Sequence, residues 1–148
     1  MPGQTERPTL DYAIVCDDVR LEVGDKISLM GLFDAIAVQS FPTVQSRLAV
    51  VAAWMDVRGE VKSEIQLVDP SGSLLRSLGV ALLQQKGKRK GARHITVALN
   101  VPFKTAGIYQ IKFYLDEQLV RSIDLPVESV GTPQSGFRRM GGKLSDLG

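Results

Sequence analysis

The sequence predicts an all-β fold, an antiparallel β-sandwich of about eight strands. Apolar residues recur at every second position in several segments, which is the period of a half-buried strand. The segments between them hold turn-forming residues, and no window of a dozen residues has a convincing period near 3.6. The 148 residues, 44% of them hydrophobic, fit one domain. We expect a flexible N-terminus over 1–8, the sandwich over 9–128 and a flexible tail over 129–148.

The first half of the chain is apolar on both faces of its expected strands, as is typical near the centre of a two-layer structure. In 10–16 the even positions, which end at Cys16, share one face. Beyond it the apolar positions change from odd to even near Gly31, which predicts a glycine bulge. The segments 48–57 and 74–83 are nearly all apolar and suit strands covered on both sides. A short helix over 43–47 is an alternative to strand there.

The second half alternates more regularly. Segments 61–68, 94–101 and 109–115 each carry an apolar and a wetter face, as antiparallel strands do, and Ser63 falls on the apolar face of the first. The sequence Asp69-Pro70-Ser71-Gly72 predicts a type I turn, because proline presets its own backbone angle and glycine tolerates the exit. The pair Asp116-Glu117 has the length of a tight hairpin connection before a last strand over 119–127.

Four short motifs stand in the N-terminal half: Tyr12-Ala13-Ile14-Val15-Cys16-Asp17-Asp18-Val19-Arg20, Gly24-Asp25-Lys26, Gly31-Leu32-Phe33-Asp34 and Phe41-Pro42. Over roughly residues 9–70 these motifs resemble the opening of a small bacterial family known only as a domain of unknown function. The resemblance implies a bacterial origin and an all-β domain. It transfers no activity and no catalytic residue.

A second resemblance covers roughly residues 94–127. The run Gly107-Ile108-Tyr109-Gln110-Ile111, followed by a hairpin, is similar to the late strands of immunoglobulin-like sandwiches. In those folds a tyrosine near the start of the penultimate strand ties down a corner. The paired cysteines of true immunoglobulin domains are missing. The resemblance therefore implies an immunoglobulin-like architecture and no particular function.

The composition argues against several classes of protein. With 18 Lys+Arg against 16 Asp+Glu, the net charge of +2 indicates no basic coat for nucleic acid. No apolar run reaches the roughly 18 residues that cross a bilayer, and the first residues lack a signal-like apolar segment, so we expect a cytoplasmic protein without membrane contact. Cys16 and His94 are the only residues of their types. We expect a buried structural thiol and an exposed strand histidine, no enzymatic activity and no cofactor.

An acidic group near the first strand is the candidate for a cation site. Asp17 and Asp18 are adjacent, and Glu22, Asp25 and Asp34 follow within a short distance in the sequence. Clustered oxygens suit Ca²⁺ or Mg²⁺, which leaves a metal-dependent enzyme as one alternative function. Consecutive strand residues point to opposite faces, however, so the first two would not converge. The favoured interpretation is that Asp18 ends the strand and bonds loop amides or Arg20, with no metal bound.

A basic connector is the candidate for a polyanion site. It carries Lys86, Lys88, Arg89, Lys90 and Arg93 with no acid among them. These side chains could neutralise phosphates and give salt-sensitive binding, so nucleic acid is a possible partner. No aromatic residue is interleaved to stack on bases. We therefore favour a solvated hairpin whose charges keep neighbouring strands apart.

The tail contains a small hydrophobic and basic cluster that could dock on a partner: Phe137, Arg138, Arg139 and Met140. Together these observations favour a non-enzymatic protein-interaction or assembly module. We expect it to bind another protein, or a second copy of itself, through a sheet edge or through this tail.

Overall fold

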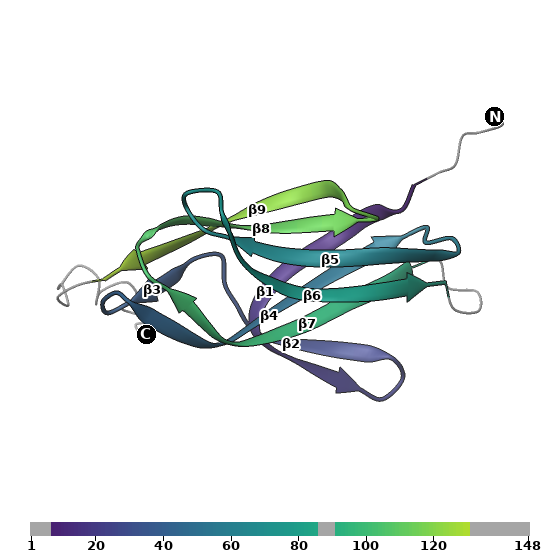
Figure 1. The fold of residues 1–148 in the computed structure, drawn as a ribbon. Helices are drawn as coiled ribbons and strands as arrows, with labels where there is room; N and C mark the ends of the chain where they lie inside the picture. The colour runs from purple at the N-terminus through teal and green to yellow at the C-terminus, as the bar shows by residue number, and fades with distance from the viewer. Residues whose placement is uncertain (1–6, 86–90, 131–148) are drawn as a thin grey trace.

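Nine strands and no helix make up the part of the chain that the computed structural model describes, residues 7–85 and 91–130. The strands are shown in Figure 1 and have these bounds: β1 (Thr9–Glu22), β2 (Lys26–Leu32), β3 (Ile36–Val38), β4 (Thr43–Met55), β5 (Glu60–Val68), β6 (Leu74–Gln84), β7 (Gly91–Phe103), β8 (Gly107–Leu115) and β9 (Gln118–Ser129). The all-β prediction is confirmed, with nine strands in place of about eight. A search of the described residues for a helix able to cross a membrane found none.

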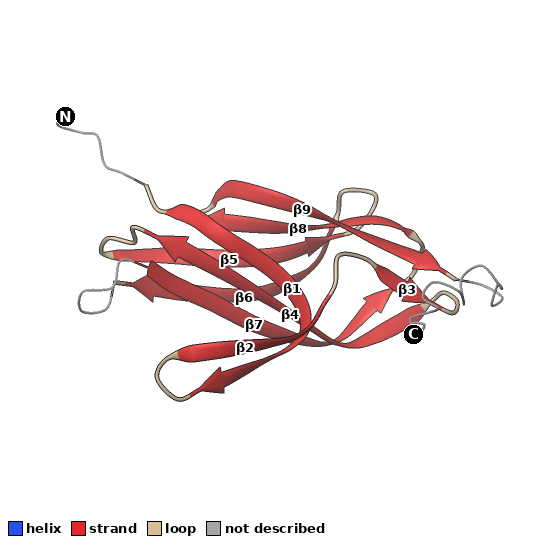
Figure 2. Ribbon diagram, turned by 180° about the vertical axis from the view of Figure 1, so that it is seen from behind, coloured by secondary structure: helices blue, strands red, loops and turns tan. Residues whose placement is uncertain are grey.

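The strands form two packed sheets. Sheet A has the order β2-β1-β4-β7, and sheet B has the order β3-β9-β8-β5-β6. The pairings are antiparallel except for β3 with β9, where Ile36–Val38 runs parallel to Val127–Ser129. This is the two-layer sandwich that the strand spacing predicts, and Figure 2 shows the two layers from behind. Of the predicted tail over 129–148, only Ser129 and Val130 are described, and the backbone N–H of Val130 donates to the carbonyl of Val38.

The core lies between the two sheets and is centred on β4. Its largest fully buried side chains are Trp54, Tyr109, Phe103 and Phe113. Every residue over 48–54 is buried, which confirms that this strand is covered on both faces. The alternative of a helix over 43–47 is wrong, because Thr43–Arg47 pairs with β7 as the first part of β4.

Strand β6 does not match the prediction made for it. Its apolar composition indicated cover on both sides, but Val80 is 56% exposed and Leu82 is 63% exposed. The reason is that the described residues form only two layers, so the side chains of β6 that point away from the core meet no third layer. An apolar composition shows that a segment suits a strand, but it does not show where in the fold that strand lies.

Two predicted turns are confirmed. One carboxylate oxygen of Asp69 accepts the backbone N–H groups of Ser71 and Ser73 and the hydroxyl of Ser71, and these bonds hold the pKa of Asp69 below its ordinary value. In the β8–β9 hairpin, Asp116 and Glu117 have φ of 47° and 70°. Positive φ at both central residues is the geometry of the type I′ turn, whose twist matches that of the flanking strands.

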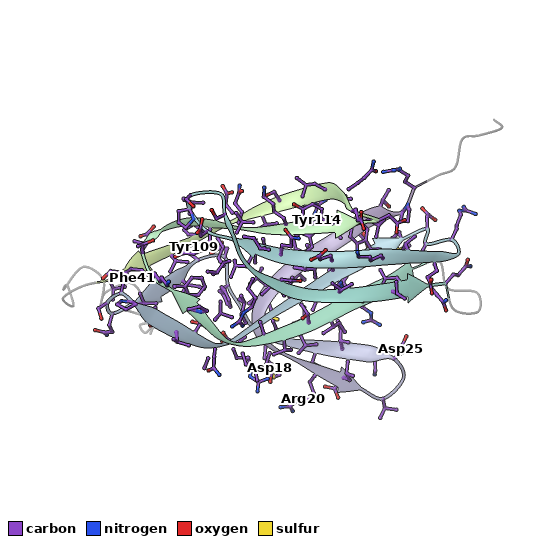
Figure 3. The ribbon with its side chains drawn as sticks, viewed as in Figure 1. Asp18, Arg20, Asp25, Phe41, Tyr109 and Tyr114 are labelled. Carbon is purple, nitrogen blue, oxygen red and sulfur yellow. The ribbon has the colours of Figure 1, made fainter. Side chains whose placement is uncertain are left out.

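Tyr109, which the immunoglobulin-like resemblance singles out, fixes the connection between β7 and β8 as expected. The Tyr109 hydroxyl, near the start of β8, donates to the backbone carbonyl of Thr105 at 2.7 Å. The Tyr109 ring stands edge-on to Phe103, with ring centroids 4.9 Å apart (Figure 3 labels Tyr109). The connection between β7 and β8 is therefore fixed by a buried ring at one end of the sandwich.

The predicted glycine bulge at Gly31 is wrong. The pairs Cys16–Leu32 and Asp18–Met30 lie on either side of it in one unshifted register. Gly31 instead has a φ of 69°, and a Cβ there would lie 2.3 Å from a carboxylate oxygen of Asp17. The change of buried face has another cause, because the chain leaves sheet A after β2 and joins sheet B at β3.

Candidate functional site

Strand β1 takes part in two different pairings, and its second half forms a projecting arm. Residues 9–16 pair with β4 in the body of sheet A, whereas residues 16–22 pair with β2. We call residues 17–32 the arm. In Figures 1 and 2 it stands out from the two packed layers. The arm exposes large apolar side chains, with Leu21 73%, Val23 91% and Leu32 60% exposed.

The outer edge of the arm is β2, which within residues 7–85 and 91–130 has a strand partner on one side only. Lys26 is the single charged residue of β2, and the six residues from Ile27 to Leu32 carry no charge and no proline. Natural proteins protect open edges with charged residues, proline, bulges or short strands, because an open edge offers unpaired N–H and C=O groups to another chain. Strand β2 has none of these protections along those six residues.

The other edges of the sandwich are protected. Strand β9 carries Arg121, Asp124 and Pro126 along the part that has β8 as its only described partner, and β3 has only three residues. Where β6 and β7 meet, their side chains reach across to each other's carbonyl groups. Arg76 of β6 donates to the carbonyls of Leu99 and Asn100 on β7 at 2.8 and 3.2 Å.

We call this meeting of β6 and β7 the seam. Thr96 of β7 donates its hydroxyl to the carbonyl of Leu78 on β6, so the bonds run in both directions. Gly79 allows the close approach, since a Cβ there would lie 2.8 Å from the Thr96 hydroxyl and 3.3 Å from Nε2 of His94. Three backbone carbonyls along this edge, those of Leu78, Leu99 and Asn100, are thus already occupied.

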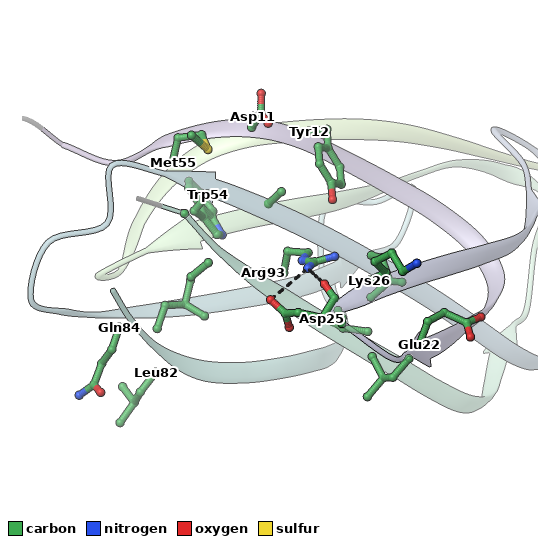
Figure 4. A pocket seen from close by; sticks show the side chains of 18 residues that line it. Asp11, Tyr12, Glu22, Asp25, Lys26, Trp54, Met55, Leu82, Gln84 and Arg93 are labelled. Atoms are coloured by element: carbon green, nitrogen blue, oxygen red, sulfur yellow. Dashed lines mark hydrogen bonds and ion pairs between the residues drawn. The ribbon is translucent and has the colours of Figure 1, made fainter. Parts of the chain in front are cut away.

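A groove of about 880 Å³ lies between the tip of the arm and the ends of β4, β6 and β7. Tyr12, Trp54 and Ile95 are among its apolar lining residues (Figure 4). Arg93 bridges the groove: its guanidinium donates to the backbone carbonyl of Asp25 at 2.7 Å and lies 3.8 Å from the Asp25 carboxylate. This contact ties the arm tip to the outer face of sheet A.

Of the predicted polyanion site, the structure describes only Arg93, and this residue is engaged by Asp25. The other four residues of that prediction lie outside the described residues: Lys86, Lys88, Arg89 and Lys90. The predicted docking cluster of the tail also lies outside them: Phe137, Arg138, Arg139 and Met140.

The acidic residues near β1 are dispersed. The prediction that Asp18 ends its strand is wrong, because β1 continues to Glu22. Asp18 accepts the backbone N–H of Val19 at 2.9 Å and pairs with Arg47 at 3.1 Å, in place of the expected Arg20. Long-range folding brings Arg47 of β4 to this position, which the local sequence could not indicate.

The remaining acids have separate surroundings. Glu22 accepts the hydroxyl of Ser28 at 2.8 Å, and Asp25 lies at the arm tip, away from Asp18 at its base (Figure 3). Asp34 is exposed beyond the end of β2. Within the described ranges no three His, Cys, Asp or Glu residues gather in a way that could hold a metal ion.

Cys16 is fully buried, as predicted, and its thiol donates to the carbonyl of Asp18 at 3.4 Å. Burial is the largest cause that raises its pKa, which keeps the thiol protonated and a poor nucleophile. Cys16 pairs with Ala49, whereas His94 pairs with Ala52. Neighbouring strands place these two residues on opposite faces of sheet A, so they do not form a Cys–His pair.

The prediction of an exposed histidine is wrong. His94 is only 4% exposed, and its Nδ1 lies 2.7 Å from the hydroxyl oxygen of Ser63, which is fully buried on β5. Burial lowers the pKa of His94, so the imidazole is held neutral. The sequence did contain a signal: a serine on the apolar face of a strand requires a buried partner across the core.

The two packed sheets and the corner held by Tyr109 define an immunoglobulin-like β-sandwich. Three solved structures are similar in shape, all at low identity. An alkylpurine DNA glycosylase of Pseudomonas fluorescens bound to DNA has 8% identity and a TM-score of 0.43; the match covers 82% of this chain and 30% of that one, so this chain spans less than a third of its length. A CARDB domain of Pyrococcus furiosus with two metal ions (14%, TM-score 0.38) and an immunoglobulin-like protein of Pseudomonas aeruginosa (8%, TM-score 0.38) are each matched over 84% of this chain and 99% of theirs.

The chain belongs to the family of unknown function DUF6941, whose pattern it matches over residues 11–128. This confirms the resemblance to a family of unknown function, and the match ends one residue before β9 does. No curated protein matches the chain.

Proposed function

We propose that this domain is a non-enzymatic protein-interaction or assembly module that binds an extended polypeptide segment by strand addition to β2. The single observation that carries the proposal is the unprotected edge from Ile27 to Leu32, on a sandwich whose other edges are charged, short or closed by the seam. Main-chain hydrogen bonds would supply the affinity, and the exposed apolar side chains of the arm would supply selectivity.

The surroundings of the polar residues support binding in preference to catalysis. The Ser63–His94 pair, which has the residue types of a nucleophile and a base, is enclosed in the core where a substrate does not reach. Arg93, the described member of the basic connector, is engaged by Asp25, so a polyanion would have to displace an existing contact. Neither the dispersed acids nor Arg93 therefore offers an alternative with comparable support.

The proposal is tested with two adjacent proline variants, Ser28→Pro and Leu29→Pro. Consecutive strand residues direct their N–H groups to opposite sides, so one variant removes an outward N–H and the other breaks the pairing with β1. Amide hydrogen exchange of β1 identifies the variant that keeps the arm intact. A matched substitution on β6 outside the groove, Val80→Thr, serves as the control.

The experiment is an affinity capture from the native host with the full chain, followed by binding of the captured partner in purified form. We expect the affinity of the arm-preserving proline variant for the partner to fall at least tenfold, whereas Val80→Thr keeps the affinity of the unaltered chain. A partner that binds the arm-preserving variant as tightly as the unaltered chain would exclude strand addition at β2.

A further inference from the structure

We infer that the segment added to β2 is the β2 strand of a second copy, which makes the arm a symmetric dimerisation element; this inference rests on the proposed function. Two β2 strands running antiparallel across a twofold axis would join the two A sheets. The result is one continuous sheet of eight strands with the order β7-β4-β1-β2-β2-β1-β4-β7. Both open edges are consumed in this arrangement, so assembly stops at two copies.

The charge pattern of β2 suits pairing with itself. A strand that meets its own copy places identical residues around the axis, and like charges directly opposite each other are destabilising. Because Lys26 is the only charge and stands at one end, the two Lys26 side chains lie at opposite ends of the pair. In a pairing centred on Met30, each Lys26 lies beyond the last residue of the other copy's β2, at the end where the exposed carboxylate Asp34 follows that strand.

The exposed apolar side chains of the arm also favour pairing with a second copy. Leu32 is 60% exposed in the single chain, and a pairing centred on Met30 places it opposite Ser28 of the second copy. Leu21 and Val23, which are exposed to 73% and 91%, lie toward the tip, where they would approach the second copy's body. Burial of such side chains adds to the backbone hydrogen bonds of the strand pair.

Cysteine substitution tests the symmetry directly, because the native Cys16 is fully buried and gives little background. In an antiparallel pair the residue at the axis faces its own copy within reach of a disulfide. We would compare Leu29→Cys and Met30→Cys with Val23→Cys, whose side chain is 91% exposed but would lie far from the axis. The proline variant that preserves the arm is then compared with the unaltered chain by sedimentation velocity.

The expected result is a species of twice the chain's mass that is lost in the proline variant, with covalent dimers formed under mild oxidation by one axial cysteine and not by Val23→Cys. The inference is overturned if the protein is a monomer at all concentrations and neither axial cysteine crosslinks above the level of Val23→Cys. If capture of another protein still depends on β2 in that case, the proposed function stands without the dimer. A dimer that the proline variant does not disrupt also overturns it, since another surface would hold the copies together.

Discussion

The edge strands on the two long sides of the sandwich differ in whether their backbone groups have partners within the domain. At the seam, β6 and β7 approach each other, and Arg76 and Thr96 occupy main-chain carbonyls of the facing strand. At the arm, β2 has β1 as its one strand partner among the described residues, and six consecutive uncharged residues lie along its open edge. Both edges are apolar, so apolar composition alone does not make an edge available. Availability depends on whether the backbone groups already have partners within the domain.

The largest expected effect comes from filling the close approach at the seam. In Gly79→Val the new side chain meets the Thr96 hydroxyl and His94, because a Cβ at this position already lies 2.8 Å from the hydroxyl oxygen. We expect the free energy of unfolding to fall by about 2–3 kcal/mol, the upper part of the usual range of about 1–3 kcal/mol for overpacking. Urea denaturation measures it, and Val80→Ile on the exposed face of the same strand is the control. Equal stability of both variants would show that the seam is loosely packed.

A second effect concerns pH and the buried histidine. Burial lowers the pKa of folded His94 from the ordinary value of 6.5, so below that pH the unfolded chain binds a proton that the folded chain does not. Stability is therefore fully present above pH 6.5 and falls as the pH drops toward the folded pKa, by about 1.4 kcal/mol per unit.

The measurement is urea denaturation between pH 7 and 5. His94→Gln, which keeps a polar partner for Ser63, should remove this dependence, whereas Ser63→Ala should lower stability throughout and keep it. An unchanged slope in His94→Gln would assign the pH dependence to other groups.

A smaller effect is expected from Arg76→Ala, which removes two hydrogen bonds between the sheets. We expect a loss of about 1–2 kcal/mol, since bonds from a charged donor contribute more than neutral ones. The more informative result is association: a freed seam edge should aggregate faster on mild heating, as measured by light scattering. If Arg76→Ala stays as soluble as the unaltered chain, side-chain bonds are not what protects this edge.

The smallest effect on global stability is expected at the arm. Arg93→Ala removes the contact with Asp25, a half-exposed ion pair with one backbone hydrogen bond, and should cost about 0.5–1 kcal/mol. Amide exchange over 17–32 should nevertheless accelerate several-fold while exchange at the seam is unchanged. Arg121→Ala on β9 is the charge-matched control. Acceleration at the seam in Arg93→Ala would mean that the two sides are not independent.

The sequence predicts those features that depend on neighbouring residues. Asp69-Pro70-Ser71-Gly72 forms its turn and Tyr109 anchors its corner, because both need only a few consecutive positions. Features that depend on which strands face each other were missed. The burial of His94 follows from its position opposite Ser63, thirty-one residues away, and the exposure of β6 follows from the absence, among the described residues, of a third layer over its outer face.

The arm could not be predicted for the same reason. Alternation along 10–16 indicates a strand, and the apolar residues after Lys26 indicate another. Nothing in that pattern says that β1 divides its length between β4 and β2, because the division is decided by residues 43–55 elsewhere in the chain. The open edge of β2, which carries the proposed function, is a consequence of this division.

The shared strand β1 also bears on the order in which sheet A forms. Pairs between β1 and β2 join residues that are close in the chain, the widest being Cys16 with Leu32, whereas β1 meets β4 through pairs as distant as Thr9 with Met55. Local hairpins form in about 1–10 μs, whereas distant pairings first require closure of a long loop. We therefore expect the β1–β2 pairs to form early, but a two-stranded hairpin is only marginally stable by itself, so the arm gains its stability when β4 adds to β1. The open edge of β2 thus becomes lasting only once the rest of sheet A is in place.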